Sequence, residues 1–135
     1  IIGLADSVGV AVPNQIKKTF SLIKELAPNL PLRTHLHNTR NTGLANAAAA
    51  IDAGVTIIDS STGGIGGCPF APKATGNIPT DDLLYMLNRS GVETGVDLNL
   101  VVENSEWLET KLGRAVPAMV PKAGIFPENA EINMQ

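Results

Sequence analysis

The feature that most constrains the fold is a regular alternation of short apolar runs with longer helical patterns. The runs IIGLA (1–5), LPLRTHLH (30–37) and VTIIDS (55–60) have the length and apolar content of buried strands. Between them, residues 14–27 space their apolar side chains at helical intervals, and residues 42–54 are rich in alanine, a strong helix former. Strands that alternate with helices in this way predict parallel β/α units.

Polar residues follow each of the three apolar runs. Asp6 comes after the first run, residues 35–38 end the second, and Asp59 lies near the end of the third. The catalytic residues of β/α barrels collect at the carboxyl ends of the strands, so we expect these side chains on one functional edge. Three strands cannot close a barrel, and an eight-stranded barrel takes about 250 residues. The pattern therefore predicts a partial (β/α)8 TIM barrel, about the last three β/α units; a small open three-stranded α/β sheet is the alternative.

The second half of the chain predicts helices and an irregular tail. Thr80 is expected to be the N-cap of a helix that ends at Gly91. A last helix is expected at about Leu98–Leu112, starting after Asp97. The tail, residues 115–135, contains prolines and has little periodicity, so we expect it to be irregular. The predicted domain organisation is therefore a barrel part over residues 1–114 and a tail over 115–135.

Composition excludes several classes of protein. The chain has 135 residues, of which 44% are hydrophobic and 17% charged, as in a globular domain. Its net charge of -3, without a basic cluster, argues against a nucleic-acid partner. No apolar stretch reaches the about 20 residues of a membrane span, and the first residues do not resemble a secretory leader. A single cysteine fits a reducing compartment, so we expect an intracellular protein.

The two histidines of the chain, His35 and His37, lie two residues apart. In a strand this spacing places both imidazoles on one face, about 7 Å apart at the backbone, so they can bind one metal ion if a neighbouring loop adds further ligands. The alternatives are a polar strand face and core histidines with hydrogen-bonded rings. The position of the pair at a strand end favours the metal site.

A glycine-rich loop, STGGIGGCPFAPKATGN (61–77), follows the third strand. It lacks the Gly-Lys-Ser/Thr of a phosphate-binding loop and the spacing of the dinucleotide fingerprint. Its glycines indicate a loop that passes close to a ligand. Cys68 lies between glycine and proline, where a catalytic thiol is a better interpretation than a buried inert one. Asn77 ends the loop and offers an amide oxygen to a cation or a cap to the next helix.

Four segments together resemble one enzyme family. LADSVGVAVP, HLHNTRNTGLANAAAAIDAGV, DSSTGGIGGCPFAPKATGN and TDDLLYMLNRSGVETGVDL are similar, in this order, to the C-terminal half of hydroxymethylglutaryl-CoA lyase. The resemblance covers roughly residues 2–98, and the loop with Cys68 is its most specific element. Related enzymes on the same barrel, such as isopropylmalate synthase and pyruvate carboxylase, share the His-x-His strand but lack this loop.

The resemblance implies roles for five residues. His35 and His37 match the two metal-ligating histidines of the family, and Asn77 matches its amide ligand. Asp6 matches an active-site aspartate on the sixth barrel strand, and Cys68 matches the catalytic loop cysteine. The family's other metal ligand, an aspartate on the first strand, and the adjacent arginine have no counterpart in this chain.

Four positions depart from the family within the matched region. Asn38 replaces an Asp, as in the synthases, and Asp81 stands where Glu is more usual. Asn41 and Lys73 replace residues that are often Gly.

The activity that the resemblance implies is the retro-aldol (Claisen-type) cleavage of 3-hydroxy-3-methylglutaryl-CoA to acetyl-CoA and acetoacetate. A divalent cation, Mg²⁺ or Mn²⁺, would acidify the tertiary hydroxyl, and His35 or Asp6 would accept its proton. A thiol, with an ordinary pKa of about 8.5, is suited to protonate the thioester enolate, which assigns Cys68 as the acid.

We therefore expect the C-terminal part of a lyase domain that acts on an acyl-CoA substrate and assembles as a homo-oligomer. Such an enzyme would be cytoplasmic in a bacterium and located in the mitochondrial matrix in a eukaryote. The alternatives are a catalytically silent fragment and, because of Asn38, a related carbon–carbon-forming synthase. The isolated 135-residue chain is expected to be inactive, since part of the site is missing.

Overall fold

The computed structural model describes residues 1–67, 73 and 75–127. These residues divide into two compact units: unit 1 comprises residues 1–60 and 66–78, and unit 2 comprises 61–65 together with the chain from residue 79. The elements of unit 1 are β1 (Ile2–Asp6), α1 (Pro13–Leu26), β2 (Leu32–Leu36), α2 (Gly43–Asp52) and β3 (Ile57–Asp59). Those of unit 2 are η1 (Thr62–Gly64), α3 (Thr80–Arg89), α4 (Leu98–Leu112) and α5 (Val120–Ala123).

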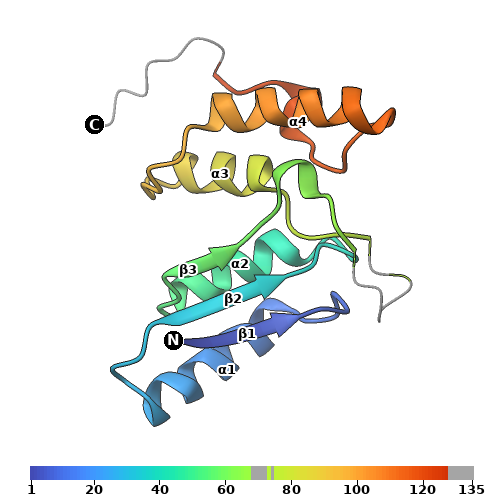
Figure 1. Ribbon diagram of the computed structural model, residues 1–135. Coiled ribbons are helices and arrows are strands. Elements are labelled where there is room, and N and C mark those ends of the chain that lie inside the picture. Colours follow the sequence, from blue (N-terminus) through green and yellow to red (C-terminus); the bar gives the residue numbers. More distant parts are fainter. Residues whose placement is uncertain (68–72, 74, 128–135) are drawn as a thin grey trace. The chain divides into compact units, whose positions relative to one another are not determined.

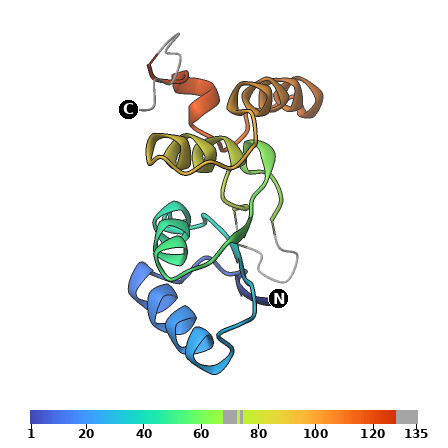
Figure 2. The ribbon, with the colours of Figure 1, turned by 90° about the vertical axis from the view of Figure 1, so that its left-hand side faces the viewer.

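Unit 1 is a β-α-β-α-β layer structure with parallel strands, as the alternation predicts. The sheet order is β1-β2-β3, and both strand pairs are parallel. Helices α1 and α2 cover one face of the sheet, as Figures 1 and 2 show. Within the described part of unit 1, no helix covers the opposite face.

The alternation of side chains along β2 separates a core face from a functional face. Leu32, Thr34 and Leu36 are fully or almost fully buried, whereas Arg33 is exposed and His35 is half-buried. The buried set lies on the helix side, where α1 contributes the buried Ile16 and Phe20 and α2 contributes small alanines. His35 therefore projects from the face that the helices leave open.

The helices of unit 2 are held by buried carboxylates. In Figures 1 and 2, α3 and α4 lie side by side. Asp81, in the first turn of α3, is completely buried and accepts hydrogen bonds from the backbone N–H of Gly63 at 2.7 Å and from the Ser105 hydroxyl at 2.5 Å. The carboxylate thereby joins η1, α3 and α4.

Two expectations for this half of the chain are wrong. The N-cap of α3 is Pro79, and Thr80 is already the first helical residue. Moreover, the short helix α5 lies in the tail that was expected to be irregular. It is stabilised from outside the tail, because the Asp82 carboxylate accepts the backbone N–H groups of Met119 and Val120 at 2.8–3.1 Å.

The expected helix at Leu98–Leu112 is confirmed at both ends. The Asp97 side chain accepts the N–H groups of Asn99 and Leu100, and Gly113 ends the helix with a φ of 64°. Of the helices that the structure describes, none has the length and apolar character required to cross a membrane.

Candidate functional site

The two imidazoles of the chain converge at the carboxyl end of β2. The Nε2 atoms of His35 and His37 are 3.4 Å apart, and the ring centroids are 5.3 Å apart at an interplanar angle of 61°. Two nitrogen ligands at 2.0–2.1 Å from one divalent ion are about 3.0–3.4 Å apart for octahedral to tetrahedral geometry. The spacing of the two Nε2 atoms therefore suits a shared ion, and the prediction that both rings face the same way is confirmed.

The His37 imidazole is buried, and this burial affects its protonation. Its side chain is only 3% exposed, and burial lowers the pKa of its imidazole, with a further lowering by His35 and an opposing effect of Asp6. A lowered pKa favours the neutral ring, which is the form that binds metals. Its Nδ1 atom is buried and has no hydrogen-bond partner among the described residues.

Asn77 lies beside His37. The two residues form an isolated antiparallel bridge, flanked by backbone hydrogen bonds from Asn38 N–H to the Gly76 carbonyl and from Ile78 N–H to the Leu36 carbonyl. The side-chain amide of Asn77 donates to the Gly66 carbonyl at 3.3 Å. Pro79 is the N-cap of α3, so Asn77 is not its cap.

Asp6 holds the loop between β1 and α1. Its Oδ1 accepts the N–H of Val10 at 3.1 Å and its Oδ2 accepts the N–H of Ala11 at 2.9 Å. The side chain is almost buried and lies close enough to His37 to influence its pKa. The carboxylate thus combines a structural function with a position beside the histidines.

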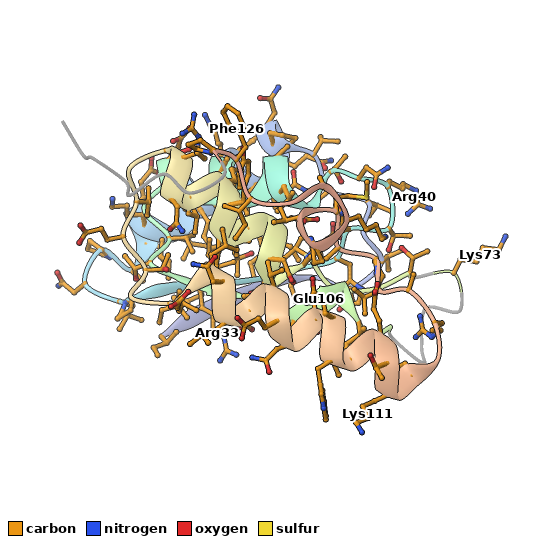
Figure 3. The ribbon with its side chains drawn as sticks, turned by 90° about the horizontal axis from the view of Figure 1, so that it is seen from above. Arg33, Arg40, Lys73, Glu106, Lys111 and Phe126 are labelled. Carbon is orange, nitrogen blue, oxygen red and sulfur yellow. The ribbon has the colours of Figure 1, made fainter. Side chains whose placement is uncertain are left out.

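The loop after β2 is fixed by Asn38 and Arg40. The Asn38 Oδ1 atom accepts the N–H of Gly43 at 3.0 Å, at the start of α2. The Arg40 guanidinium, labelled in Figure 3, donates to the carbonyls of Val8 and Gly9 at 3.2 and 3.0 Å. Asn38, which departs from the family pattern, therefore supplies an acceptor oxygen that this turn requires.

A charged pair beside His35 was missed by the sequence reasoning. Arg33 donates to both carboxylate oxygens of Asp59, with Nε at 3.0 Å from each oxygen and a terminal nitrogen at 2.8 Å from Oδ2. This hydrogen bonding raises the pKa of the Arg33 guanidinium. Asp59 Oδ2 also lies 3.5 Å from His35 Nδ1. The available signal was the spacing of Arg33 and His35, which predicts that they share a face.

The remaining site prediction, Cys68, lies outside the described residues. Within residues 1–67, 73 and 75–127, no three His, Cys, Asp or Glu side chains gather closely enough to hold a metal ion. The donor side chains that the structure brings together are the two imidazoles, and the backbone of Asn77 is bridged to that of His37.

Comparison with known proteins defines the family. Residues 1–107 match the family model described as HMGL-like. The chain is 49% identical over 126 residues to (R)-citramalyl-CoA lyase of Chloroflexus aurantiacus, covering 93% of this chain and 40% of that protein. It is 37% identical over 117 residues to hydroxymethylglutaryl-CoA lyase of Bacillus subtilis, covering 87% and 39%.

A solved structure gives the same result. The HMG-CoA lyase from Acinetobacter baumannii, in complex with coenzyme A and 3-methylmalate, matches with a TM-score of 0.89 and 42% identity over 97% of this chain and 43% of that chain. The chain therefore belongs to the HMGL-like family, and its fold is a partial (β/α)8 TIM barrel, as expected. It spans about 40% of the length of the curated relatives it matches.

Proposed function

We propose that residues 1–114 are the C-terminal part of the barrel of a metal-dependent carbon–carbon lyase, with 115–135 as its tail. The proposed reaction is the cleavage of 3-hydroxy-3-methylglutaryl-CoA to acetyl-CoA and acetoacetate. The observation that carries this proposal is the pair of Nε2 atoms of His35 and His37, 3.4 Å apart beside Asn77, in a chain of the HMGL-like family.

His35, His37 and Asn77 would hold the ion, Mg²⁺ or Mn²⁺. Oxygen-rich ligation favours Mg²⁺, whereas two imidazoles favour Mn²⁺. When bound, a divalent cation lowers the pKa of a substrate hydroxyl and so eases its deprotonation.

Asp6 is the better of the two candidate bases. His35 would use Nε2 for the ion, and its Nδ1 faces Asp59 at 3.5 Å, so neither nitrogen remains for the substrate proton. Each carboxylate oxygen of Asp6 accepts one backbone N–H, which leaves further lone pairs for a proton. We therefore assign Asp6 as the base that takes the proton of the tertiary hydroxyl.

Cys68 would complete the proton balance. Loss of the hydroxyl proton to Asp6 lets the carbon–carbon bond break, which forms a ketone and leaves its electron pair as a thioester enolate. The Cys68 thiol then donates a proton to the enolate carbon, and acetyl-CoA is released. The glycine-rich loop that carries Cys68 would cover the site and exclude water.

Citramalyl-CoA is the second candidate substrate. The relative that is 49% identical over 93% of this chain is named (R)-citramalyl-CoA lyase. Both candidate substrates are CoA thioesters with a tertiary hydroxyl β to the thioester carbonyl, so the same groups suit both cleavages. A related synthase is a weaker alternative, because only Asn38 suggests it.

The test is turnover of both thioesters by the full-length protein with Mg²⁺ or Mn²⁺, followed by mass spectrometry of the products. We expect free acetyl-CoA from at least one substrate, and a loss of turnover of about 10²-fold or more in Asp6→Asn and Cys68→Ala. Asp52→Asn is the matched control, because Asp52 forms an exposed ion pair with Lys17 on the helix side of the sheet. Failure to cleave either thioester, or unchanged turnover in both site variants, would overturn the proposal.

Three further expectations accompany this function. The protein would bind an acyl-CoA, assemble as a homo-oligomer and work inside the cell, in the cytoplasm or the mitochondrial matrix. Relatives with 40% and 38% identity are named cytoplasmic and mitochondrial lyases. The homo-oligomer is supported by exposed apolar side chains on α1, Leu22 and Leu26, and is tested by light scattering, in which a monomer would contradict it.

A further inference from the structure

We propose that Asp59 is a positioning residue that holds the His35 ring so that its Nε2 lone pair points toward His37. The inference rests on the proposed metal site, because it concerns how one of the proposed ligands is oriented. Asp59 would accept the Nδ1–H of His35, and the proton on Nδ1 leaves Nε2 as the free acceptor nitrogen.

The strand register brings the two residues together. β2 and β3 are parallel with His35 opposite Asp59, so both side chains project from the same face of the sheet. Asp59 Oδ2 is 3.5 Å from His35 Nδ1, and on the other side of the ring His35 Nε2 is 3.4 Å from His37 Nε2. A movement of about 0.5 Å would bring Asp59 and His35 to hydrogen-bonding distance.

Arg33 fixes the carboxylate in this orientation. It lies two residues before His35 on the same strand face, opposite Ile57, and binds both oxygens of Asp59 at 2.8–3.0 Å. A bidentate guanidinium restricts a carboxylate in angle as well as in position. The Arg33 side chain is 51% exposed and that of Asp59 is 27% exposed. Because exposed ion pairs add little to stability, orientation of His35 is the better explanation of this arrangement.

The two histidines need different kinds of support. His37 is 3% exposed and is held by the packing around it. His35 has a side chain that is 39% exposed, so packing alone does not restrict its ring. A carboxylate on Nδ1 supplies the missing restraint, and such partners of ligating histidines typically contribute 10- to 100-fold in metal affinity.

The first test is the tautomer of His35 in the metal-free protein. Long-range ¹H–¹⁵N NMR spectra identify which imidazole nitrogen carries the proton, measured near pH 8, above the ordinary imidazole pKa of about 6.5. The wild-type protein should carry the proton on Nδ1 of His35, and Asp59→Ala should move it to Nε2. Asp59→Asn keeps an acceptor oxygen and should restore the wild-type tautomer in part. A His35 tautomer that is the same in wild type and Asp59→Ala would overturn the proposal.

The second test is Mn²⁺ binding, followed by the EPR signal of the free ion. Asp59→Ala should weaken binding 10- to 100-fold, and Asp52→Ala, the matched control in α2, should leave it unchanged. Arg33→Met keeps the carboxylate and should weaken binding less than Asp59→Ala; an equal or larger loss would assign the effect to the ion pair and overturn the proposal. If the wild-type protein does not bind Mn²⁺, the proposed metal site fails, and the tautomer test still decides the role of Asp59.

Discussion

Replacement of Asp81 by alanine should destabilise unit 2 more than any exposed substitution in it. Asp81 is 0% exposed, and its two oxygens accept the Gly63 N–H at 2.7 Å and the Ser105 hydroxyl at 2.5 Å. Gly63 has a φ of 68°, and a Cβ there would lie 2.9 Å from Cβ of Val116. The Gly63 N–H thus has little freedom to turn toward another acceptor.

The magnitude follows from the two hydrogen bonds. A hydrogen bond to a charged group contributes about 1.5–3 kcal/mol, and Asp81→Ala removes two of them and leaves two buried donors unsatisfied. We expect the free energy of unfolding to fall by about 3–5 kcal/mol. Ser105→Ala removes one bond and should cost about 1.5–3 kcal/mol.

The assay is urea unfolding, followed by far-UV circular dichroism and by the fluorescence of Trp107, the single tryptophan, which lies in α4. A double-mutant cycle of Asp81→Ala and Ser105→Ala should give a coupling energy of at least about 1 kcal/mol. Glu106→Ala, an exposed neighbour of Ser105, is the control and should change stability by less than about 0.5 kcal/mol. A loss below about 1 kcal/mol for Asp81→Ala would refute the reasoning.

Three other perturbations test the remaining parts of the molecule. In Gly43→Ala, the new Cβ would meet the Ile78 side chain and would lie 2.9 Å from Asn38 Oδ1 and 3.1 Å from the His37 carbonyl. We expect the free energy of unfolding in urea to fall by about 1–3 kcal/mol. An unchanged unfolding midpoint would contradict the packing around Gly43. Burial lowers the pKa of His37 in the folded state, so the unfolded state takes up the proton first as the pH decreases. The stability of the metal-free protein should therefore fall below about pH 6.5. This fall should be smaller in His37→Gln. The isolated 135-residue chain should not cleave either thioester with Mg²⁺ or Mn²⁺, and measurable acetyl-CoA release would show that the site needs no further residues.

Features that depend on local spacing could be predicted from the sequence. The period of two in β2 placed His35 and His37 on one face, and their Nε2 atoms do converge. The ends of α4 were predicted because Asp97 and Gly113 act within one turn of the helix. The parallel order of the strands followed from the alternation of short apolar runs with helical patterns.

Features that depend on distant partners could not be predicted in this way. Helix α5 was missed because its N-terminal N–H groups are bound by Asp82, which lies 37 and 38 residues earlier in the chain. Asp59 was expected at the functional edge, but its pairing with Arg33 was missed because the two residues lie 26 positions apart and the pairing depends on the register between β2 and β3. The α3 start was misplaced by one residue, since Pro79 has the extended backbone of an N-cap without a capping side chain.

The register between β2 and β3 also limits how this part of the barrel can evolve. β3 contains three residues, and its last, Asp59, is the one that lies opposite His35. Residues 53–56 connect α2 to β3 in a hydrogen-bonded turn, in which the N–H groups of Val55 and Thr56 donate to the carbonyls of Ala50 and Leu32. An insertion or deletion of one residue that shifted the strand pairing would turn Asp59 to the helix side and bring Ile58 or Ser60 opposite His35. Length changes in this connection should therefore survive in homologues only where the pairing of the strands is preserved.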